Sequence, residues 1–85
     1  MHPETMSRVL QALGDASGGL TVGGLAAASG LSYGAAQRAV AEADRRGWLR
    51  PVNAIQRIGQ QRRWALSEAG WRQLNGMAAT QAYWR

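Results

Sequence analysis

The sequence predicts a small, mainly α-helical domain that carries one β-hairpin, and three patterns support this prediction. Four segments have apolar residues at helical spacing, together with residues that favour helix ends. The second and third of these are joined by a tight turn at Gly30, of the length found in a helix-turn-helix. Residues 54–66 contain two short strand-like runs with a turn between them. We therefore expect a single domain over residues 1–85.

The first two predicted helices cover residues 3–14 and 21–29. The first opens with a proline, which suits the first turn of a helix, and its apolar residues recur at helical spacing. In the second, Thr21 is a suitable N-cap and Leu20 can pack on Leu25 as a hydrophobic staple. Two glycines weaken its first turns, so tertiary packing must stabilise it.

The third predicted helix, residues 32–46, has two distinct faces. Ser32 is a suitable N-cap, and Gly47 can adopt the left-handed conformation that ends a helix. A narrow apolar stripe is formed by Ala36, Ala39, Val40 and Ala43. The opposite face mixes hydrogen-bonding and small side chains, namely Tyr33, Gly34, Gln37, Arg38, Ala41 and Arg45.

Two interpretations of this polar face remain open. A mixture of hydrogen-bonding and small side chains suits a surface that enters a DNA major groove. Charged and amide side chains are also typical of an ordinary solvated helix face. Arg45 and Arg46 can each form an ion pair with Glu42 on a neighbouring turn, so we expect them to have a structural or backbone-positioning role.

The predicted hairpin has strands over residues 54–58 and 62–66. Alternation places Trp64 and Leu66 on its inner face. Residues 48–51 are expected to leave the third helix as an extended segment, because a proline disfavours helical backbone in the residue before it.

The last predicted helix covers residues 67–84, with Ser67 as N-cap and an interruption at Gly76. Near the end of this helix, large side chains form a stripe that consists of Met77, Thr80, Tyr83 and Trp84. We expect this stripe to form a dimer interface in preference to packing on the first helix. The remaining tryptophans are Trp48, Trp64 and Trp71. Tryptophan rings can stack on the bases of a single strand, but the positions of these three in the sequence favour the hydrophobic core.

Composition narrows the possible partners. The net charge is +5 and all ten basic residues are arginines, which favours a polyanionic partner that two-point contacts can grip. A GC-biased coding sequence also explains arginine in place of lysine, but it leaves the positive charge unexplained. The chain has no cysteine, no signal peptide and no apolar run long enough to span a membrane, so we expect a cytoplasmic protein.

Two motifs resemble winged helix-turn-helix transcriptional regulators of the MarR and PadR kind. The first runs from Leu31-Ser32 through Arg38-Ala39-Val40 to Arg46-Gly47-Trp48-Leu49-Arg50. The second is Arg62-Arg63-Trp64-Ala65-Leu66-Ser67-Glu68-Ala69-Gly70, which is similar to the returning wing strand and the cap of the next helix. The resemblance covers about residues 20–74 and implies a recognition helix in the major groove, with the wing at a phosphate backbone or minor groove.

On this basis the third helix is the expected recognition helix. Arg38 suits the guanine edge and Gln37 the adenine edge, each by two-point hydrogen bonding. The recognition-helix candidates are Ser32, Tyr33, Gly34, Gln37 and Arg38, and the wing candidates are Arg57, Gln60, Gln61, Arg62 and Arg63. Two glutamines replace the acidic residue that the MarR type carries before the wing arginine, and 85 residues leave no room for its ligand-shaping helices. We therefore expect no small-molecule effector.

The expected function is a sequence-specific regulator of transcription that binds double-stranded DNA as a homodimer, most simply a repressor. One alternative is a winged helix that serves as a protein-interaction module, such as an inhibitor or adaptor. Another is a DNA-binding component of a replication, partition or mobile-element system. We expect no enzyme activity, cofactor or metal, because the single histidine lies at position 2 and the five acids are scattered.

Overall fold

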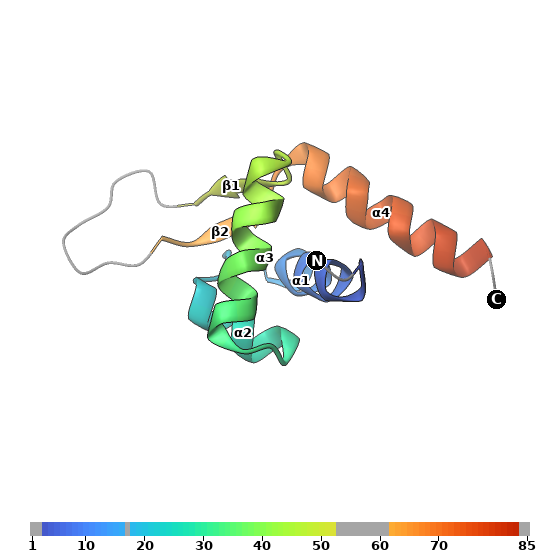
Figure 1. The fold of residues 1–85 in the computed structure, drawn as a ribbon. Coiled ribbons are helices and arrows are strands. Elements are labelled where there is room, and N and C mark those ends of the chain that lie inside the picture. Colours follow the sequence, from blue (N-terminus) through green and yellow to red (C-terminus); the bar gives the residue numbers. More distant parts are fainter. Residues whose placement is uncertain (1–2, 17, 53–61, 84–85) are drawn as a thin grey trace.

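The computed structural model of the chain describes residues 3–16, 18–52 and 62–83. Within them, four helices and two strands follow in the order α1, α2, α3, β1, β2, α4 (Figure 1). Their bounds are Pro3–Asp15 (α1), Val22–Ser29 (α2), Tyr33–Arg45 (α3), Leu49–Pro51 (β1), Trp64–Leu66 (β2) and Glu68–Tyr83 (α4). The predicted mainly α-helical class with a small antiparallel hairpin is confirmed.

The caps of α2 and α3 are the hydroxyls that the sequence indicates. Thr21 Oγ1 accepts a hydrogen bond from the N–H of Gly24, and Ser32 Oγ accepts one from the N–H of Ala35, both at 3.1 Å. Because these residues are caps, each helix begins one residue later than predicted.

The C-terminal end of α3 is closed by backbone hydrogen bonds around Gly47, whose φ is +78°. The Gly47 N–H donates to the carbonyl of Asp44, and the Trp48 N–H donates to that of Ala43, each at 3.0 Å. This pair of bonds is the Schellman arrangement, which requires a left-handed residue that glycine adopts without steric cost. It turns the chain sharply from α3 into β1.

Helix α1 lies at the centre of the fold and packs against α2, α3, α4 and β2. The core consists of Met6, Val9, Leu10, Leu13, Leu25, Ala39, Val40, Ala43, Leu49, Leu66 and Leu74. Trp48 and Trp64 are half-buried against it, as predicted. Trp71 is 46% exposed, so its predicted core position is wrong. Helix α4 turns Gly70 and Leu74 inward instead, which leaves Trp71 at the margin of the buried face.

The hairpin pairs differently from the prediction. Leu66 pairs with Leu49, and Trp64 with Pro51, so the partner of the returning strand is residues 49–51. The predicted strand over residues 54–58 and the turn that follows it lie outside the described residues. The observed pairing buries Leu49 and Leu66 opposite each other, at 6% and 3% exposure.

A further bridge holds β2 on its other side. Leu20 and Trp64 exchange both backbone hydrogen bonds, at 2.8 and 2.9 Å. No local pattern in the sequence indicates this contact. It ties the start of the helix-turn-helix to the hairpin.

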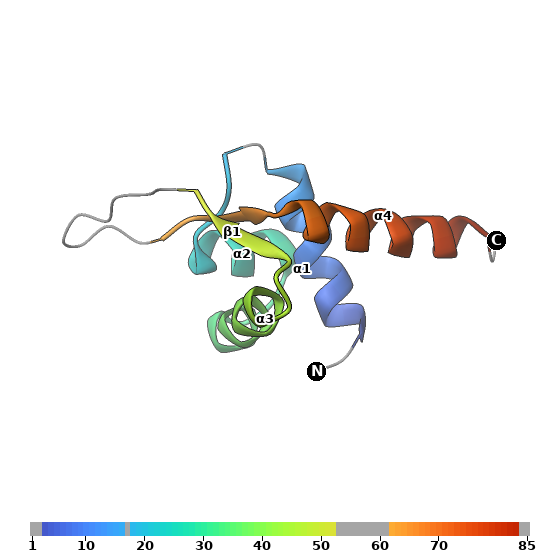
Figure 2. The same cartoon turned by 90° about the horizontal axis from the view of Figure 1, so that it is seen from above.

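Helix α4 is continuous through Gly76, so the predicted interruption is wrong. One glycine inside a helix costs only about 1 kcal/mol relative to alanine, which the rest of a 16-residue helix tolerates. Met77 packs against the core. This contact agrees with the alternative interpretation, in which the stripe packs within the domain and not on a second copy. Thr80 and Tyr83 belong to α4, and Trp84 lies outside the described residues. The C-terminal half of α4 projects from the body, on the side opposite the hairpin (Figures 1 and 2).

Candidate nucleic-acid interface

The outer face of α3 is uncovered. The apolar stripe faces the core, with Ala36, Ala39 and Ala43 at 0% exposure. The polar face points outward, and its exposed members are Tyr33, Gly34, Gln37, Arg38, Ala41 and Arg45. The two faces that the spacing predicts are thus the inner and outer sides of the helix.

The N-terminal turn of α3 can bind an anion. Ser32 Oγ uses an acceptor position for the Ala35 N–H, so its own hydrogen can still be donated to a ligand. The first-turn N–H groups of a helix lack intrahelical partners and carry a partial positive charge, which suits a phosphate. Nothing lies within 4 Å of the position that a Cβ on Gly34 would occupy, so the backbone is open to close approach.

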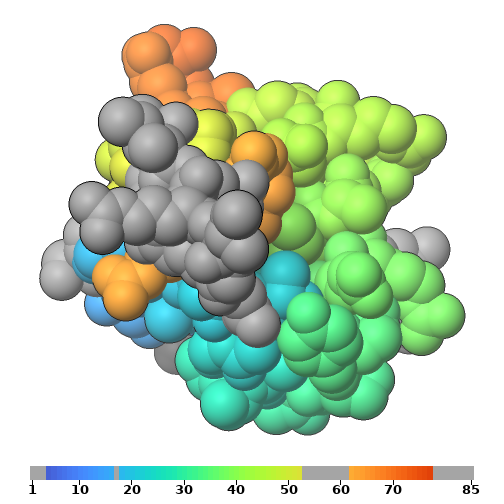
Figure 3. Space-filling model, turned by 90° about the vertical axis from the view of Figure 1, so that its left-hand side faces the viewer, coloured from blue at the N-terminus to red at the C-terminus, as the bar shows by residue number. Residues whose placement is uncertain are grey.

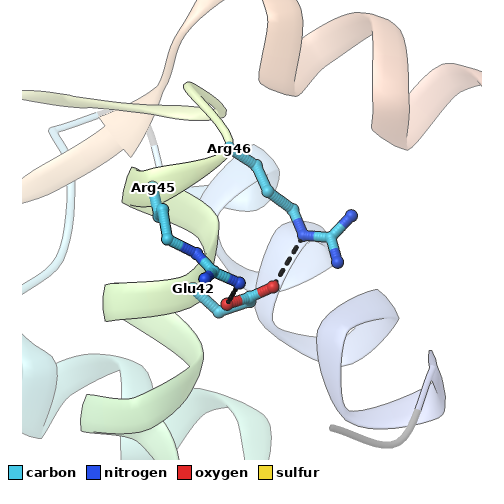
Figure 4. Close-up of polar contacts among 3 residues, drawn as sticks. All are labelled: Glu42, Arg45 and Arg46. Atoms are coloured by element: carbon cyan, nitrogen blue, oxygen red, sulfur yellow. Dashed lines mark hydrogen bonds and ion pairs between the residues drawn. The ribbon is translucent and has the colours of Figure 1, made fainter.

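Ion pairs neutralise arginines on other parts of the surface. Arg8 pairs with Glu4 in α1, and Arg72 pairs with Glu68 in α4, at 3.1 and 2.6 Å. At the end of α3, Glu42 binds both Arg45 and Arg46, which confirms the pairing that the sequence predicts (Figure 4).

Two arginines near the interface have no such partner. Within the part of the chain that the structure describes, the side chains of Arg38 and Arg50 form no hydrogen bond or ion pair. All three glutamates of the chain are already engaged elsewhere. Positive charge is therefore left available on the outer face of α3 and on β1.

The Glu42 cluster makes a prediction about pH. Hydrogen bonds from Arg45, and then from Arg46, hold the pKa of Glu42 below its usual value of 4.5. Because this pKa is lower in the folded than in the unfolded state, the ionised carboxylate of Glu42 stabilises the fold. This stabilisation is complete above about pH 4.5 and is lost as the pH falls through the folded-state pKa. We expect Glu42→Gln to lower the melting temperature slightly at pH 7, and we expect this difference to shrink as the pH falls below 4.5. A difference that persists at low pH in thermal unfolding would contradict this assignment.

The start of β2 carries exposed arginines. Arg62 and Arg63 are both exposed, and the Arg62 guanidinium lies 5.5 Å from the centre of the Trp64 ring. The Val52 N–H donates to the carbonyl of Arg63 at 3.0 Å, so the hairpin continues to this point. The other predicted wing residues, Arg57, Gln60 and Gln61, lie outside the described residues.

The hairpin strands and α3 share one side of the molecule. β1 packs against α3 and runs across it rather than along it (Figure 1). Seen from the side from which the hairpin projects, the surface of α3 (green) lies directly beside that of the strands (Figure 3). In the view from above, the outer side of α3 faces away from α1, and no other helix or strand of the described residues lies over it (Figure 2). The arrangement presents a ridge flanked by a basic hairpin.

Arg50 is a candidate that the sequence analysis missed. It lies on β1, opposite Ala65, and is exposed. The only signal in the sequence was an arginine before Pro51, which indicates extended backbone without showing which way the side chain points. Its place beside α3 follows from the strand pairing.

Among residues 3–16, 18–52 and 62–83, no three His, Cys, Asp or Glu side chains come together as metal ligands would. No helix within the same residues has the length and apolar character needed to cross a bilayer.

The fold and the interface together define a winged helix-turn-helix protein. Helices α2 and α3 form the helix-turn-helix, and β1 and β2 belong to the wing. The sequence model of the MarR family matches residues 5–56, and the chain belongs to this family. No curated protein sequence matches the chain.

Solved structures share the fold. A MarR family transcriptional regulator from Silicibacter pomeroyi has a TM-score of 0.79 at 23% identity, over 96% of this chain and 53% of that one. A probable transcriptional regulator from Pseudomonas aeruginosa has a TM-score of 0.77 at 25% identity, over 96% and 60%. The Staphylococcus aureus MepR-DNA complex has a TM-score of 0.70 at 14% identity, over 93% and 63%. The chain therefore spans about half the length of the first of these structures.

Proposed function

We propose that this protein is a transcriptional regulator that binds double-stranded DNA in a sequence-specific way. The observation that carries the proposal is the exposed face of α3, where Gln37 and Arg38, which has no ion-pair partner among the described residues, lie beside a basic hairpin. An α-helix fits the major groove, and amide and guanidinium groups can read base edges there by two-point hydrogen bonds. Membership of the MarR family and the DNA complex of MepR support the same role.

In the proposed complex, base reading and backbone contact fall to different residues. Arg38 and Gln37 read bases, while Tyr33, the Gly34 backbone and the Ser32 hydroxyl meet a phosphate at the start of α3. Arg50, Arg62 and Arg63 contact the phosphate backbone beside the groove. Repression by occlusion of a promoter is the simplest outcome of such binding, and it would take place in the cytoplasm.

We further propose that two copies bind together through α4. The C-terminal half of this helix projects from the rest of the domain (Figure 2). Met77 contributes partly to the core, so the contact falls mainly on the segment that includes Thr80, Tyr83 and Trp84. A two-fold arrangement of this kind places two recognition helices on half-sites related by the same symmetry.

The alternatives predict different surfaces or partners. A protein-interaction module has no need of Arg38 and Arg50 as cations without an ion-pair partner among the described residues, whereas the ion pairs described here lie on α1, α4 and the end of α3. A replication or partition component would bind DNA through the same chemistry, so the identity of the bound sites must separate it from a regulator.

Selection of bound sites from a random duplex library tests the proposal, and a palindromic product would report both specificity and two-fold symmetry. On a random duplex, binding should weaken steeply with salt, by about 0.9 log unit per log salt for each neutralised phosphate. Arg63→Ala should reduce this slope by about 0.9, and Arg72→Ala in α4 should leave it unchanged. Absent or salt-insensitive binding would contradict the proposed function.

A further inference from the structure

The end of α3 and the beginning of α4 meet at one hydroxyl group. Ser67 Oγ accepts a hydrogen bond from the Gly70 N–H at 3.1 Å, which caps α4. The same hydroxyl donates to the Gly47 carbonyl at 2.6 Å, directly after α3. A serine hydroxyl has one donor and two acceptor positions, so both bonds form together. Ser67 therefore joins two helix ends that are distant in the sequence.

Backbone contacts seat α4 on the same turn. The Ser67 N–H donates to the Trp48 carbonyl at 2.9 Å. Gly70 rests on this carbonyl so closely that a Cβ added to it would lie 2.1 Å from the oxygen. The first turn of α4 is thus packed on residues 47 and 48 without intervening space.

Those two residues also close α3. The N–H groups of Gly47 and Trp48 bind the carbonyls of Asp44 and Ala43 in the last turn of that helix. A group that holds the Gly47 carbonyl therefore restrains the C-terminal end of α3 relative to α4. Among the described residues, the Ser67 hydroxyl donates the side-chain hydrogen bond that joins this end of α3 to the start of α4.

We propose that Ser67 is a positioning residue for α3, which holds the recognition helix at the orientation that base reading requires. The inference rests on the proposed function. Hydrogen bonds to base edges tolerate only a narrow range of distance and angle, whereas attraction to phosphates falls off gradually. Loss of the bond between Ser67 and Gly47 should therefore reduce discrimination between sequences more than it reduces overall binding.

One variant separates the two hydrogen bonds of Ser67, and two further variants serve as its controls. Ser67→Asp keeps an acceptor that can cap α4, but an ionised carboxylate has no hydrogen to donate to the Gly47 carbonyl. Ala69→Asp is the matched control, because it adds the same charge at an exposed position in the first turn of α4. Ser67→Thr retains both bonds and should restore the properties of the unmodified protein.

Two measurements test the proposal. The first is amide hydrogen exchange at Gly47 and Trp48, which should be faster in Ser67→Asp than in Ala69→Asp, while α4 stays protected. The second is binding to a duplex selected from the random library and to an unrelated duplex of equal length. The ratio of the two affinities should fall about fivefold in Ser67→Asp, the effect expected from one hydrogen bond, and remain unchanged in Ala69→Asp.

Two results would overturn the proposal. Unchanged exchange at Gly47 and Trp48 would show that Ser67 does not restrain α3, whatever happens with DNA. An equal loss of affinity for both duplexes, relative to Ala69→Asp, would show a merely structural role. If the unmodified protein binds neither duplex, the proposed function itself is wrong. This outcome is distinguished from failure of the Ser67 proposal because the unmodified protein is measured before any variant.

Discussion

Replacing Gly70 with alanine should destabilise the protein by about 1–3 kcal/mol, the usual cost of overpacking a tight contact. The new Cβ would lie 2.1 Å from the Trp48 carbonyl oxygen and 3.0 Å from the carbonyl carbon. The backbone at this point cannot move freely, because the same oxygen accepts the Ser67 N–H at 2.9 Å. The steric cost should outweigh the gain in helix propensity, which is about 1 kcal/mol.

Gly76 provides the matched control in the same helix. It is exposed, and nothing lies within 4 Å of the position that its Cβ would take. Gly76→Ala should therefore stabilise the protein by about 0.5–1 kcal/mol. Urea unfolding of the two variants should give changes of opposite sign. Similar changes in both would show that α4 does not seat on the α3–β1 turn as described.

Local signals predicted the helices of the helix-turn-helix closely. Caps and apolar spacing depend on residues a few positions apart, and they placed the ends of α1, α2 and α3 within one residue. The strand pairing of the hairpin, by contrast, depends on contacts between residues that are distant in the sequence, and local signals do not report these. A longer connection costs only about 0.6 kcal/mol per doubling of its length, whereas burial of a leucine contributes about 1.5–3 kcal/mol. Pairing of Leu66 with Leu49 therefore prevails over pairing with a nearer segment.

In the candidate interface, too, features set by local spacing were predicted and features set by distant contacts were not. Helical spacing identified the outer face of α3 correctly, because it follows from the position of four buried residues on one helix. Arg50 was missed because its exposure depends on which strand pairs with β2. Trp71 was misplaced because its spacing along α4 suggested a core position, whereas the buried residues at the start of this helix are Gly70, which lies close to the Trp48 carbonyl, and Leu74.

Replacing Arg38 with alanine should remove sequence preference at one base pair of each half-site. A two-point contact between a guanidinium and guanine contributes about 1–3 kcal/mol of discrimination, so the preference should fall by about 5- to 150-fold. Arg38 is suited to this role because it is exposed near the middle of the outer face of α3 and has no ion-pair partner among the described residues. Base selection repeated with the variant measures the effect directly.

Arg38→Lys and Arg63→Ala separate base reading from charge. Lysine keeps the positive charge but lacks the planar fork of arginine, so Arg38→Lys should lose preference at the same base pair while binding random duplex normally. Arg63→Ala should weaken binding to all duplexes alike and leave the selected sequence unchanged, because a phosphate contact carries no sequence information. If Arg38→Lys kept the full preference, Arg38 would act through its charge alone. The base-reading role of α3 would then have to fall to Gln37, whose amide can recognise adenine without any charge.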